Sequence, residues 1–501
     1  GVHVTGVVTA TSFSGDGSSL SGIDAAPSFS GIASGSISNG DAVTITSDGK
    51  LSSVAGSSVA LSIGATSQYD NGAYASNSVY NTSANKTITA YIDNTGGTNH
   101  AKAFDTTVSG TTVSFGSITS FDTSGSASTN EKMSLAYDSN ADRVFILYER
   151  DTDIYGCVSS YTSGLNFGSA TEITTNNGNY LNAVYDSNAQ KILICFENDN
   201  QSDRGQAAVV TISNVSFSVG SFYDFFDSTD SVGYVKAAYD ESAQKTLIAF
   251  TDEGNGSYGA CTIATISGTA ISYSDKQVFS GANSTPRAVV YDPSKQKLVI
   301  IFIEDNFLYA VVGQISNNTF VHGERVKVSS KIPSTATGNT SAVYDSGSDK
   351  IVVVFRDSSQ NDGNVVVGTV SDIENTITFA EPNKLSNANM NYLGLVSDPD
   401  QKKVVAHFAD DSQNGVALAF QPPYSATNLT SQNFLGFSDA AYSNGDTAKV
   451  QLGGAIDDAQ SGLTTARKHY VQYDGSLSTT PDTPSILGGT AVSATKIVIK
   501  E

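Results

Sequence analysis

Short apolar runs rich in Val and Ile alternate with clusters of Gly, Asn, Asp and Ser along the chain. One frame of this alternation recurs seven times: an apolar run that ends in Tyr-Asp or a close variant, a polar turn of four residues, and a second apolar run such as KILICF. Two apolar runs of strand length across a short polar turn predict a β-hairpin. The frames begin at Ser78, Leu135, Ala183, Ala237, Val289, Ala342 and Leu395.

Three positions of the frame keep their chemistry. An Asp or Asn opens the turn at position zero, a base follows at plus five, and an aromatic follows at plus ten. We expect the acid and the base to meet across the mouth of the hairpin as an exposed pair worth about 0.2–1 kcal/mol, and the aromatic to pack between neighbouring units. The three sets are Asn81, Asp138, Asp186, Asp240, Asp292, Asp345 and Asp398; Lys86, Arg143, Lys191, Lys245, Lys297, Lys350 and Lys403; and Tyr91, Tyr148, Phe196, Phe250, Phe302, Phe355 and Phe408.

The frames lie roughly 50 residues apart, which is the length of one propeller blade. A third apolar run and a fourth one with Phe or Tyr follow each hairpin, so each unit is a four-stranded meander that must stack on its neighbours. The chain is therefore predicted to be all-β, with a seven-bladed β-propeller at 57–422. Because the last blade ends after its third run at 415–420, we expect the segment 57–65 to pair beside that run and close the ring.

The segments on either side of the ring resemble each other. FSGIASGSISNGDAVTI from Phe29 aligns without a gap to FLGFSDAAYSNGDTAKV from Phe434, and SDGKLSS from Ser47 matches YDGSLST from Tyr473. Two small related β modules are predicted from this likeness. The first, with an attachment segment, occupies 1–56, and the fuller second one occupies 423–501.

The two ends also resemble parts of known virion proteins. GVVTATSFSGDGSSLSGI, from Gly6 to Ile23, resembles the repeat in stems and attachment regions of tailed-phage fibres and related trimeric adhesins. The run from Asn428 to Thr480 resembles a module that recurs in structural proteins of marine, especially cyanobacterial, tailed phages. The resemblance implies a tail-fibre-like appendage of a bacteriophage, in the virion and extracellular, with other virion proteins as partners and a homotrimer formed through the stem.

Composition excludes several classes of partner. The net charge of -22 repels phosphate backbones, which argues against nucleic acid. No apolar stretch approaches the roughly 20 residues of a membrane span, so no membrane insertion is expected. The three cysteines, Cys157, Cys195 and Cys261, lie in separate apolar runs and are expected to be buried free thiols rather than disulfides or zinc ligands.

Catalytic patterns are weak in this sequence. The five histidines are far apart and lack metal-ligand spacing, and no Gly-x-Ser-x-Gly elbow or phosphate-binding loop is present. A sialidase-like glycan hydrolase needs convergent arginines, and the chain has no Trp and seven Arg scattered over the frames. The chain is therefore predicted not to be an enzyme and to need no cofactor, and a glycan hydrolase stays as an alternative that an Arg and carboxylate cluster in one pocket would favour.

The loops that follow the plus-ten aromatic are the predicted binding site. They vary in length and share one rim with the connections between blades, and variable loops on a rigid scaffold are the usual place of binding. A solvated acidic rim without a ligand is the competing interpretation, and Ca²⁺ held by Asp151 and Asp153 of RDTDIYG is a third. The candidate rim residues are Asp93, Asp151, Asp153, Asn198, Asp199, Asp252, Glu304, Asp357 and Asp410.

These patterns together predict a virion appendage protein that displays a β-propeller for adsorption to a host-surface glycan or protein. Many weak contacts over several blades suit such a role, because avidity then replaces single-site affinity. A structural or decorating virion protein without a receptor is the second hypothesis, and the glycan hydrolase is the third.

Overall fold

The computed structural model describes residues 27–129, 132–226, 231–336, 338–430, 432–481 and 485–500. It consists of antiparallel strands with two short 3-10 helices, η1 (Asp199–Gln201) and η2 (Glu253–Asn255), so the all-β prediction is confirmed. Within these ranges no helix has the length and apolar character of a membrane span. The chain divides into two compact units, Val59–Tyr424 and a second unit that combines Gly1–Ser58 with Ser425–Glu501.

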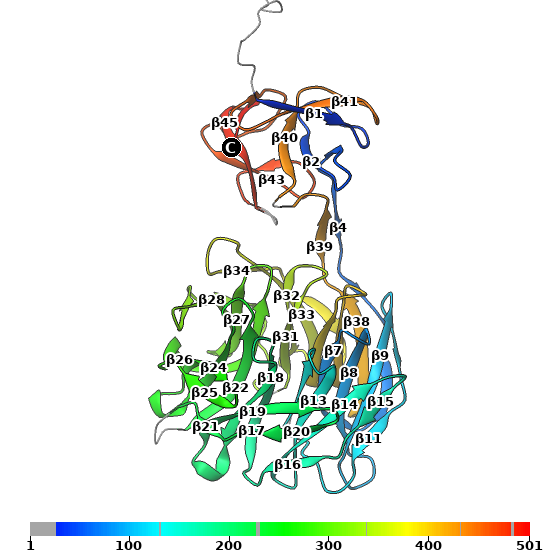
Figure 1. Ribbon diagram of the computed structural model, residues 1–501, viewed down its shortest axis with the longest axis vertical. Helices are drawn as coiled ribbons and strands as arrows, with labels where there is room; N and C mark the ends of the chain where they lie inside the picture. The colour runs from blue at the N-terminus through cyan, green and yellow to red at the C-terminus, as the bar shows by residue number, and fades with distance from the viewer. Residues whose placement is uncertain are drawn as a thin grey trace, which may run out of the picture. The chain divides into compact units, whose positions relative to one another are not determined.

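The seven frames of the sequence form the inner hairpins of Val59–Tyr424 (Figure 1). Each polar turn joins an inner strand to a second strand, with position zero paired to plus five. The hairpins are β7 (Ala73–Asn81) with β8 (Lys86–Asp93), β12 (Met133–Asp138) with β13 (Arg143–Arg150), β17 (Gly178–Asp186) with β18 (Lys191–Asn198), β22 (Val232–Asp240) with β23 (Lys245–Asp252), β26 (Gln277–Asp292) with β27 (Lys297–Glu304), β31 (Thr340–Asp345) with β32 (Lys350–Asp357), and β36 (Asn391–Asp398) with β37 (Lys403–Ala409).

A third strand pairs with the second strand of each hairpin, and shorter strands cover its outer side. The third strands are β9 (His100–Ser109), β14 (Asp153–Tyr161), β19 (Arg204–Ser213), β24 (Tyr258–Ser267), β28 (Phe307–Ser316), β33 (Asp362–Val370) and β38 (Asn414–Gln421). The outer strands are β10 (Thr112–Phe115), β11 (Thr119–Asp122), β15 (Leu165–Phe167), β16 (Thr171–Thr174), β20 (Ser216–Val219), β21 (Tyr223–Asp224), β25 (Ala270–Tyr273), β29 (Thr319–His322), β30 (Val326–Lys327), β34 (Ile377–Phe379) and β35 (Asn383–Ser386).

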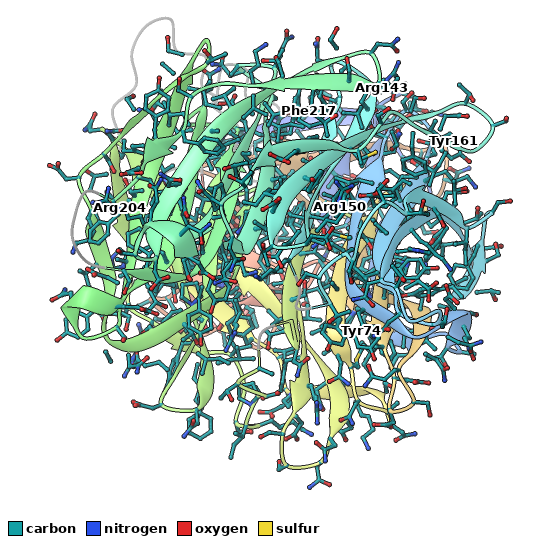
Figure 2. All side chains as sticks on the ribbon, turned by 90° about the horizontal axis from the view of Figure 1, so that it is seen from below. Tyr74, Arg143, Arg150, Tyr161, Arg204 and Phe217 are labelled. Carbon is teal, nitrogen blue, oxygen red and sulfur yellow. The ribbon has the colours of Figure 1, made fainter. Side chains whose placement is uncertain are left out.

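The inner strands close into a ring. β7, β12, β17, β22, β26, β31 and β36 contact one another in chain order, and β36 also contacts β7. Viewed along the ring, the sheets stand around a common centre, and their colours run around it in chain order (Figure 2). The first and the last repeat are therefore neighbours in space although more than 300 residues separate them in the chain.

Neighbouring blades bury the apolar faces that no single blade can cover. One core cluster joins Phe145 and Leu147 of β13 to Ile192 and Phe196 of β18. All seven aromatics at plus ten are fully buried, which confirms their predicted packing role. Full burial of such a side chain contributes about 1.5–3 kcal/mol. The three cysteines are buried and free, as expected.

The acid at position zero has a different role from the one predicted. Asp240 is buried, and its Oδ1 accepts hydrogen bonds from the backbone N–H of Ser242 and Ala243 inside the turn. The base of the same frame, Lys245, donates to Asn318 Oδ1 at 2.9 Å in the next blade. The predicted exposed ion pair is therefore wrong, because the turn amides need an acceptor and the short Asp side chain reaches them first.

The last blade is completed from the N-terminal side of the chain. β38 pairs with β5 (Ser62–Ile63) and with β6 (Ser67–Asn71), in a register that sets Phe420 against Ile63 and Val416 against Gln68. The sequence placed this strand at 57–65, whereas the structure places it at 62–71 with an interruption. The residues before it form β4 (Gly56–Val59), which pairs with β39 (Tyr424–Thr427) instead.

The two flanking segments do not fold as two modules. β1 (Ser28–Ile32), β2 (Ala42–Ile45), β3 (Leu51–Ser53), β40 (Phe434–Ser438) and β41 (Thr447–Gln451) form one sheet in the order β1-β41-β40-β2-β3. A second sheet contains β42 (Ile456–Asp457), β46 (Lys496–Ile499), β45 (Ile486–Ser493), β43 (Lys468–Val471) and β44 (Leu477–Ser478). The alignment that sets Phe29 against Phe434 also sets Ile37 against Tyr442, and these two residues exchange backbone hydrogen bonds of 3.0 and 2.8 Å. The related copies thus exchange strands and share one core, because neither is large enough to bury both faces of a sheet alone.

Candidate functional site

The acidic rim predicted from plus twelve is mostly buried. Asp93, Asn198, Asp252, Glu304 and Asp357 are at most 6% exposed, and only Asp410 of this set is half-buried. Position plus twelve lies within the second strand or at its end, where the neighbouring strands still cover it. The prediction of a solvent-exposed row of acids is therefore wrong for most of these residues.

Basic side chains from β9 and from the connections before β26 and β30 neutralise three of the buried carboxylates. Lys102 Nζ lies 2.7 Å from Asp93, Lys276 Nζ lies 2.5 Å from Asp252, and Arg325 pairs with Glu304. Burial acts to raise the pKa of Asp93, but hydrogen bonds from Lys102 and Thr95 hold it below its usual value. Such pairs support the blades, since removing one partner leaves a buried charge uncompensated.

Asp151 and Asp153, the predicted Ca²⁺ ligands, do not belong to a three-ligand group in the described part of the chain. The carboxylate of Asp151 is exposed, and its Oδ1 accepts the backbone N–H of Ser126 at 3.0 Å. The carboxylates that do converge are Glu197, Asp199 and Asp203, whose ligand oxygens lie within 4.8 Å of one another. Oxygen ligands of this kind fit Ca²⁺ or Mg²⁺.

Glu197 is the most perturbed acid of this group. Its carboxylate accepts Asn179 Nδ2 at 3.0 Å. Burial raises the pKa of Glu197 to about 8, the nearby Asp199 acts in the same direction, and the Asn179 hydrogen bond opposes both. Burial and the neighbouring carboxylates therefore favour the protonated form of Glu197. The sequence analysis included Asp199 but missed Glu197 and Asp203, although the run ENDNQSDR contains all three.

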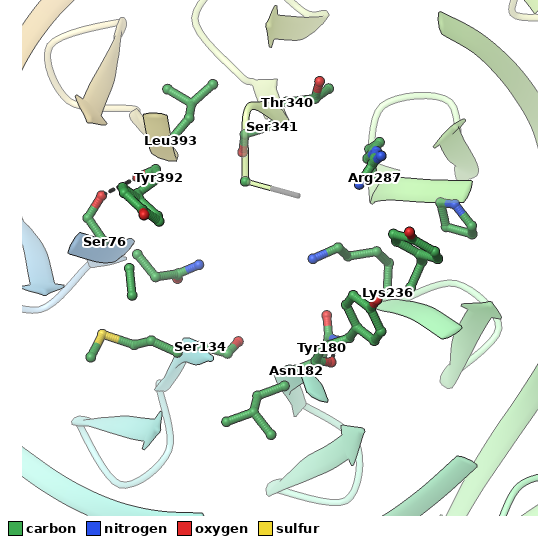
Figure 3. A pocket seen from close by; sticks show the side chains of 17 residues that line it. Ser76, Ser134, Tyr180, Asn182, Lys236, Arg287, Thr340, Ser341, Tyr392 and Leu393 are labelled. Atoms are coloured by element: carbon green, nitrogen blue, oxygen red, sulfur yellow. Dashed lines mark hydrogen bonds between the residues drawn. The ribbon is translucent and has the colours of Figure 1, made fainter. Parts of the chain in front are cut away.

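A cavity of about 110 Å³ lies at the centre of the ring, and residues on or beside all seven inner strands line it (Figure 3). The lining residues stand at frame positions minus seven to minus four. These positions lie a few residues further into the ring than position plus twelve, which pairs with minus eight. The lining residues are Ala75, Ser76, Asn77, Met133, Ser134, Tyr180, Leu181, Asn182, Tyr234, Lys236, Pro286, Arg287, Gly338, Thr340, Ser341, Tyr392 and Leu393.

Backbone bulges turn these residues toward the cavity. The pairing register shifts between Asn179 and Asn182 in the third blade, and the first, fourth and last blades shift at the same place. Four residues at minus six adopt left-handed backbone conformations, with φ of 49° at Ala75, 52° at Tyr180, 54° at Tyr234 and 53° at Tyr392. Each such residue costs about 1–2 kcal/mol relative to a relaxed strand, and strained positions of this kind cluster at functional sites.

Aromatic and cationic groups meet on one side of the cavity. The rings of Tyr180 and Tyr234 have centroids 4.8 Å apart at an angle of 31°, and the Arg287 guanidinium lies 5.1 Å from the Tyr234 centroid. Lys236 extends its side chain toward the middle of the cavity (Figure 3). Burial, the neighbouring Tyr234 and the Glu197 charge all raise the pKa of Tyr180, so its hydroxyl stays protonated and can donate.

Hydrogen bonds fix the polar part of the lining. Asn182 Nδ2 donates to the carbonyls of Tyr180 and Val235 at 2.6 and 2.8 Å and so ties the third blade to the fourth. Ser76 Oγ donates to the Tyr392 carbonyl at 2.5 Å and ties the first blade to the last. These bonds join neighbouring inner strands beside the cavity.

The cavity was not predicted from the sequence, because its lining residues precede the repeated frame, which begins at minus three. A signal was present: three of the seven frames carry Tyr at minus six, at Tyr180, Tyr234 and Tyr392. No other part of the local pattern shows that these residues converge, because their convergence depends on closure of the ring.

No family model and no curated protein matches the sequence. Similar solved structures include the NanB sialidase of Streptococcus pneumoniae, 10% identical with a TM-score of 0.43 over 72% of this chain and 69% of that chain. They also include a periplasmic gluconolactonase of Pseudomonas aeruginosa, 10% identical with a TM-score of 0.46 over 62% of this chain and 86% of that chain. A likeness at this level concerns the fold alone.

These comparisons contradict the prediction that the chain is not an enzyme, because the similar structures include a sialidase and a gluconolactonase, which are enzymes. The β-propeller fold is compatible with binding and with hydrolysis. The choice between the two depends on the chemistry of the site.

Proposed function

We propose that this chain is an adsorption protein of a virion appendage and that its propeller engages a host-surface glycan at the central cavity. The observation that supports this most strongly is the set of tyrosines at minus six, held in left-handed conformations around one cavity. Aromatic rings pack on the apolar faces of sugars, and hydroxyl and amide groups such as those of Ser134 and Asn182 bind sugar hydroxyls.

The virion setting is supported by the sequence resemblances at the two ends of the chain. The stem-like run from Gly6 to Ile23 lies outside the described residues, so the homotrimer stays a proposal that rests on the sequence. The second resemblance, from Asn428 to Thr480, falls in the unit that the two ends of the chain build together. A protein with one unit for attachment and one for contact with a surface suits adsorption.

Cleavage of the bound glycan is a second candidate function, and Glu197 favours it. A carboxylic acid that stays protonated at neutral pH can donate a proton to a glycosidic oxygen, as glycoside hydrolases require. Glu197 accepts a hydrogen bond from Asn179, which precedes Tyr180 of the cavity in the chain. Its partner in such a reaction would be Asp199 or Asp203, which lie beside it.

Binding of the purified chain to a glycan array and to candidate host cells tests the adsorption proposal. Wild type is compared with Tyr180→Ala/Tyr234→Ala, and Tyr137→Ala serves as the matched control, because Tyr137 lies at the opposite end of its inner strand beside Asp138. We expect saturable binding that the double substitution removes and the control retains, with thermal unfolding showing that all three proteins are folded. Equal binding by the double variant would refute a role for the cavity.

The same glycans, incubated with the chain and analysed for shorter products, test the second candidate. Release of products that Glu197→Gln abolishes, with binding retained, would establish hydrolysis. Binding without release of products would refute hydrolysis and leave adsorption as the proposed function.

A further inference from the structure

Two basic side chains line the central cavity from adjacent blades. Lys236 stands at minus four of β22, and Arg287 stands at minus five of β26. Arg287 is 6% exposed, and its Nη2 donates to the Thr335 carbonyl at 2.5 Å, which holds the guanidinium against the ring of Tyr234. Both residues belong to inner strands, and the connection before β31 supplies the carbonyl that holds the guanidinium.

The charge of the cavity is opposite to that of the chain. Its described lining contains two basic residues and no Asp or Glu, although the chain has 49 acidic residues against 27 basic ones. Glu197 and Glu253 are the acids that act on Tyr180 from the rim. A concave site with one sign of charge and low-dielectric walls focuses its field on a ligand of the opposite sign.

We propose that this cavity binds an anionic group of the glycan, such as the carboxylate of an acidic sugar, between Lys236 and Arg287. This inference rests on the proposed glycan binding and names the class of sugar. A guanidinium presents parallel N–H groups to a carboxylate, and an ammonium adds a second charge-assisted hydrogen bond. The rings of Tyr180 and Tyr234 then lie against the apolar face of the same sugar.

Matched glycans show how much of the affinity comes from the anionic group and how much from the sugar ring. The probes are an oligosaccharide of glucuronic acid, its carboxyl-reduced neutral counterpart, and a sulfated and a phosphorylated form of that neutral oligosaccharide. Calorimetric titration at low and at physiological salt should show the acidic form binding roughly tenfold or more tightly than the neutral one, with the difference shrinking as salt rises. The sulfated and phosphorylated forms show which anion the cavity prefers.

Substitutions of Lys236 test whether its charge causes the preference. Lys236→Gln should weaken binding of the preferred anionic form roughly tenfold to a hundredfold and weaken binding of the neutral form by a clearly smaller factor, and Lys236→Arg should restore part of the loss. Lys245→Gln removes the same charge from the same hairpin at its opposite end and should have no effect. Thermal unfolding shows whether each variant is folded.

The outcomes distinguish this inference from the proposed function. Equal affinity for acidic and neutral glycans, with binding still dependent on the two tyrosines, would overturn the anion site and leave glycan binding intact. Absence of binding to every glycan by the folded wild type would overturn both.

Discussion

Lowering the pH should loosen the seam between the first and the last blade through one buried histidine. His407 of β37 is fully buried, its Nδ1 lies 3.1 Å from Ser78 Oγ, and its Nε2 lies 3.1 Å from Thr89 Oγ1. Both hydroxyls belong to the first blade, on β7 and β8. His407 stands at plus nine of the last frame, where the other six frames carry an apolar residue or Cys. A histidine at this position thus occurs only in the blade that closes the ring.

Burial lowers the pKa of His407 from 6.5 to about 3. Above pH 6.5 the imidazole is neutral in the folded and the unfolded chain, so this group does not change the free energy of unfolding with pH. Between pH 6.5 and 3 the unfolded chain takes up a proton that the folded chain excludes, so stability falls as pH falls. At about 1.4 kcal/mol per pH unit, the loss reaches about 2 kcal/mol at pH 5 and about 4 kcal/mol at pH 3, where the folded imidazole is itself half protonated.

Urea unfolding between pH 8 and pH 4 measures this loss. The many carboxylates also titrate in this range, so the quantity of interest is the difference between wild type and His407→Gln, an amide that can bond to the same hydroxyls without titrating. The variant should lose less stability than wild type on acidification, by about 2 kcal/mol at pH 5. Identical pH profiles for the two proteins, or an imidazole that titrates near 6.5 in NMR spectra of the folded chain, would refute the reasoning.

Three further outcomes are expected from the turns and the buried thiols. Asp240→Ala should lower the free energy of unfolding by about 2–3 kcal/mol, because the turn amides lose their acceptor. Asp240→Asn should lower it by less than about 1 kcal/mol, because Asn81 accepts the same turn amides in the first blade; the denaturant midpoints of the two variants test both values. Gln244→Gly should raise the free energy of unfolding by about 0.5–1 kcal/mol, because φ is 55° there, and a lower midpoint would contradict this. Burial raises the pKa of each of the three thiols to about 12, so a thiol reagent at pH 8 should label none in the folded chain and all three in urea, and native labelling of Cys195 would contradict its burial.

Local features were predictable because they depend on residues close in the chain. The hairpins, the turn at position zero and the buried aromatics at plus ten each follow from a pattern of fewer than about 20 residues, in which period-two alternation and turn chemistry decide the outcome. The free cysteines follow from their apolar surroundings in the same way. The wrong prediction of an exposed ion pair at position zero also has a local reason: a short acid at the start of a turn accepts hydrogen bonds from the turn amides, which are closer than the base.

The binding surface was less predictable, because residues distant in the chain decide it. Asp252 is buried, and its charge is paired with Lys276 from the connection between β25 and β26, which no pattern around Asp252 shows. The tyrosines of the cavity converge only when β36 meets β7 across the whole chain. The two flanking copies likewise share one sheet because each lacks the area to form a core alone.

The sequence by itself determined the strands, their repeat and the packing residues, since seven similar units must bury similar faces. The tertiary structure decided which side chains face the centre of the ring, where the acids are neutralised, and which segment closes the last blade. The physical reason is that burial and electrostatic pairing depend on distances in space, and ring closure brings together residues that hundreds of positions separate in the chain.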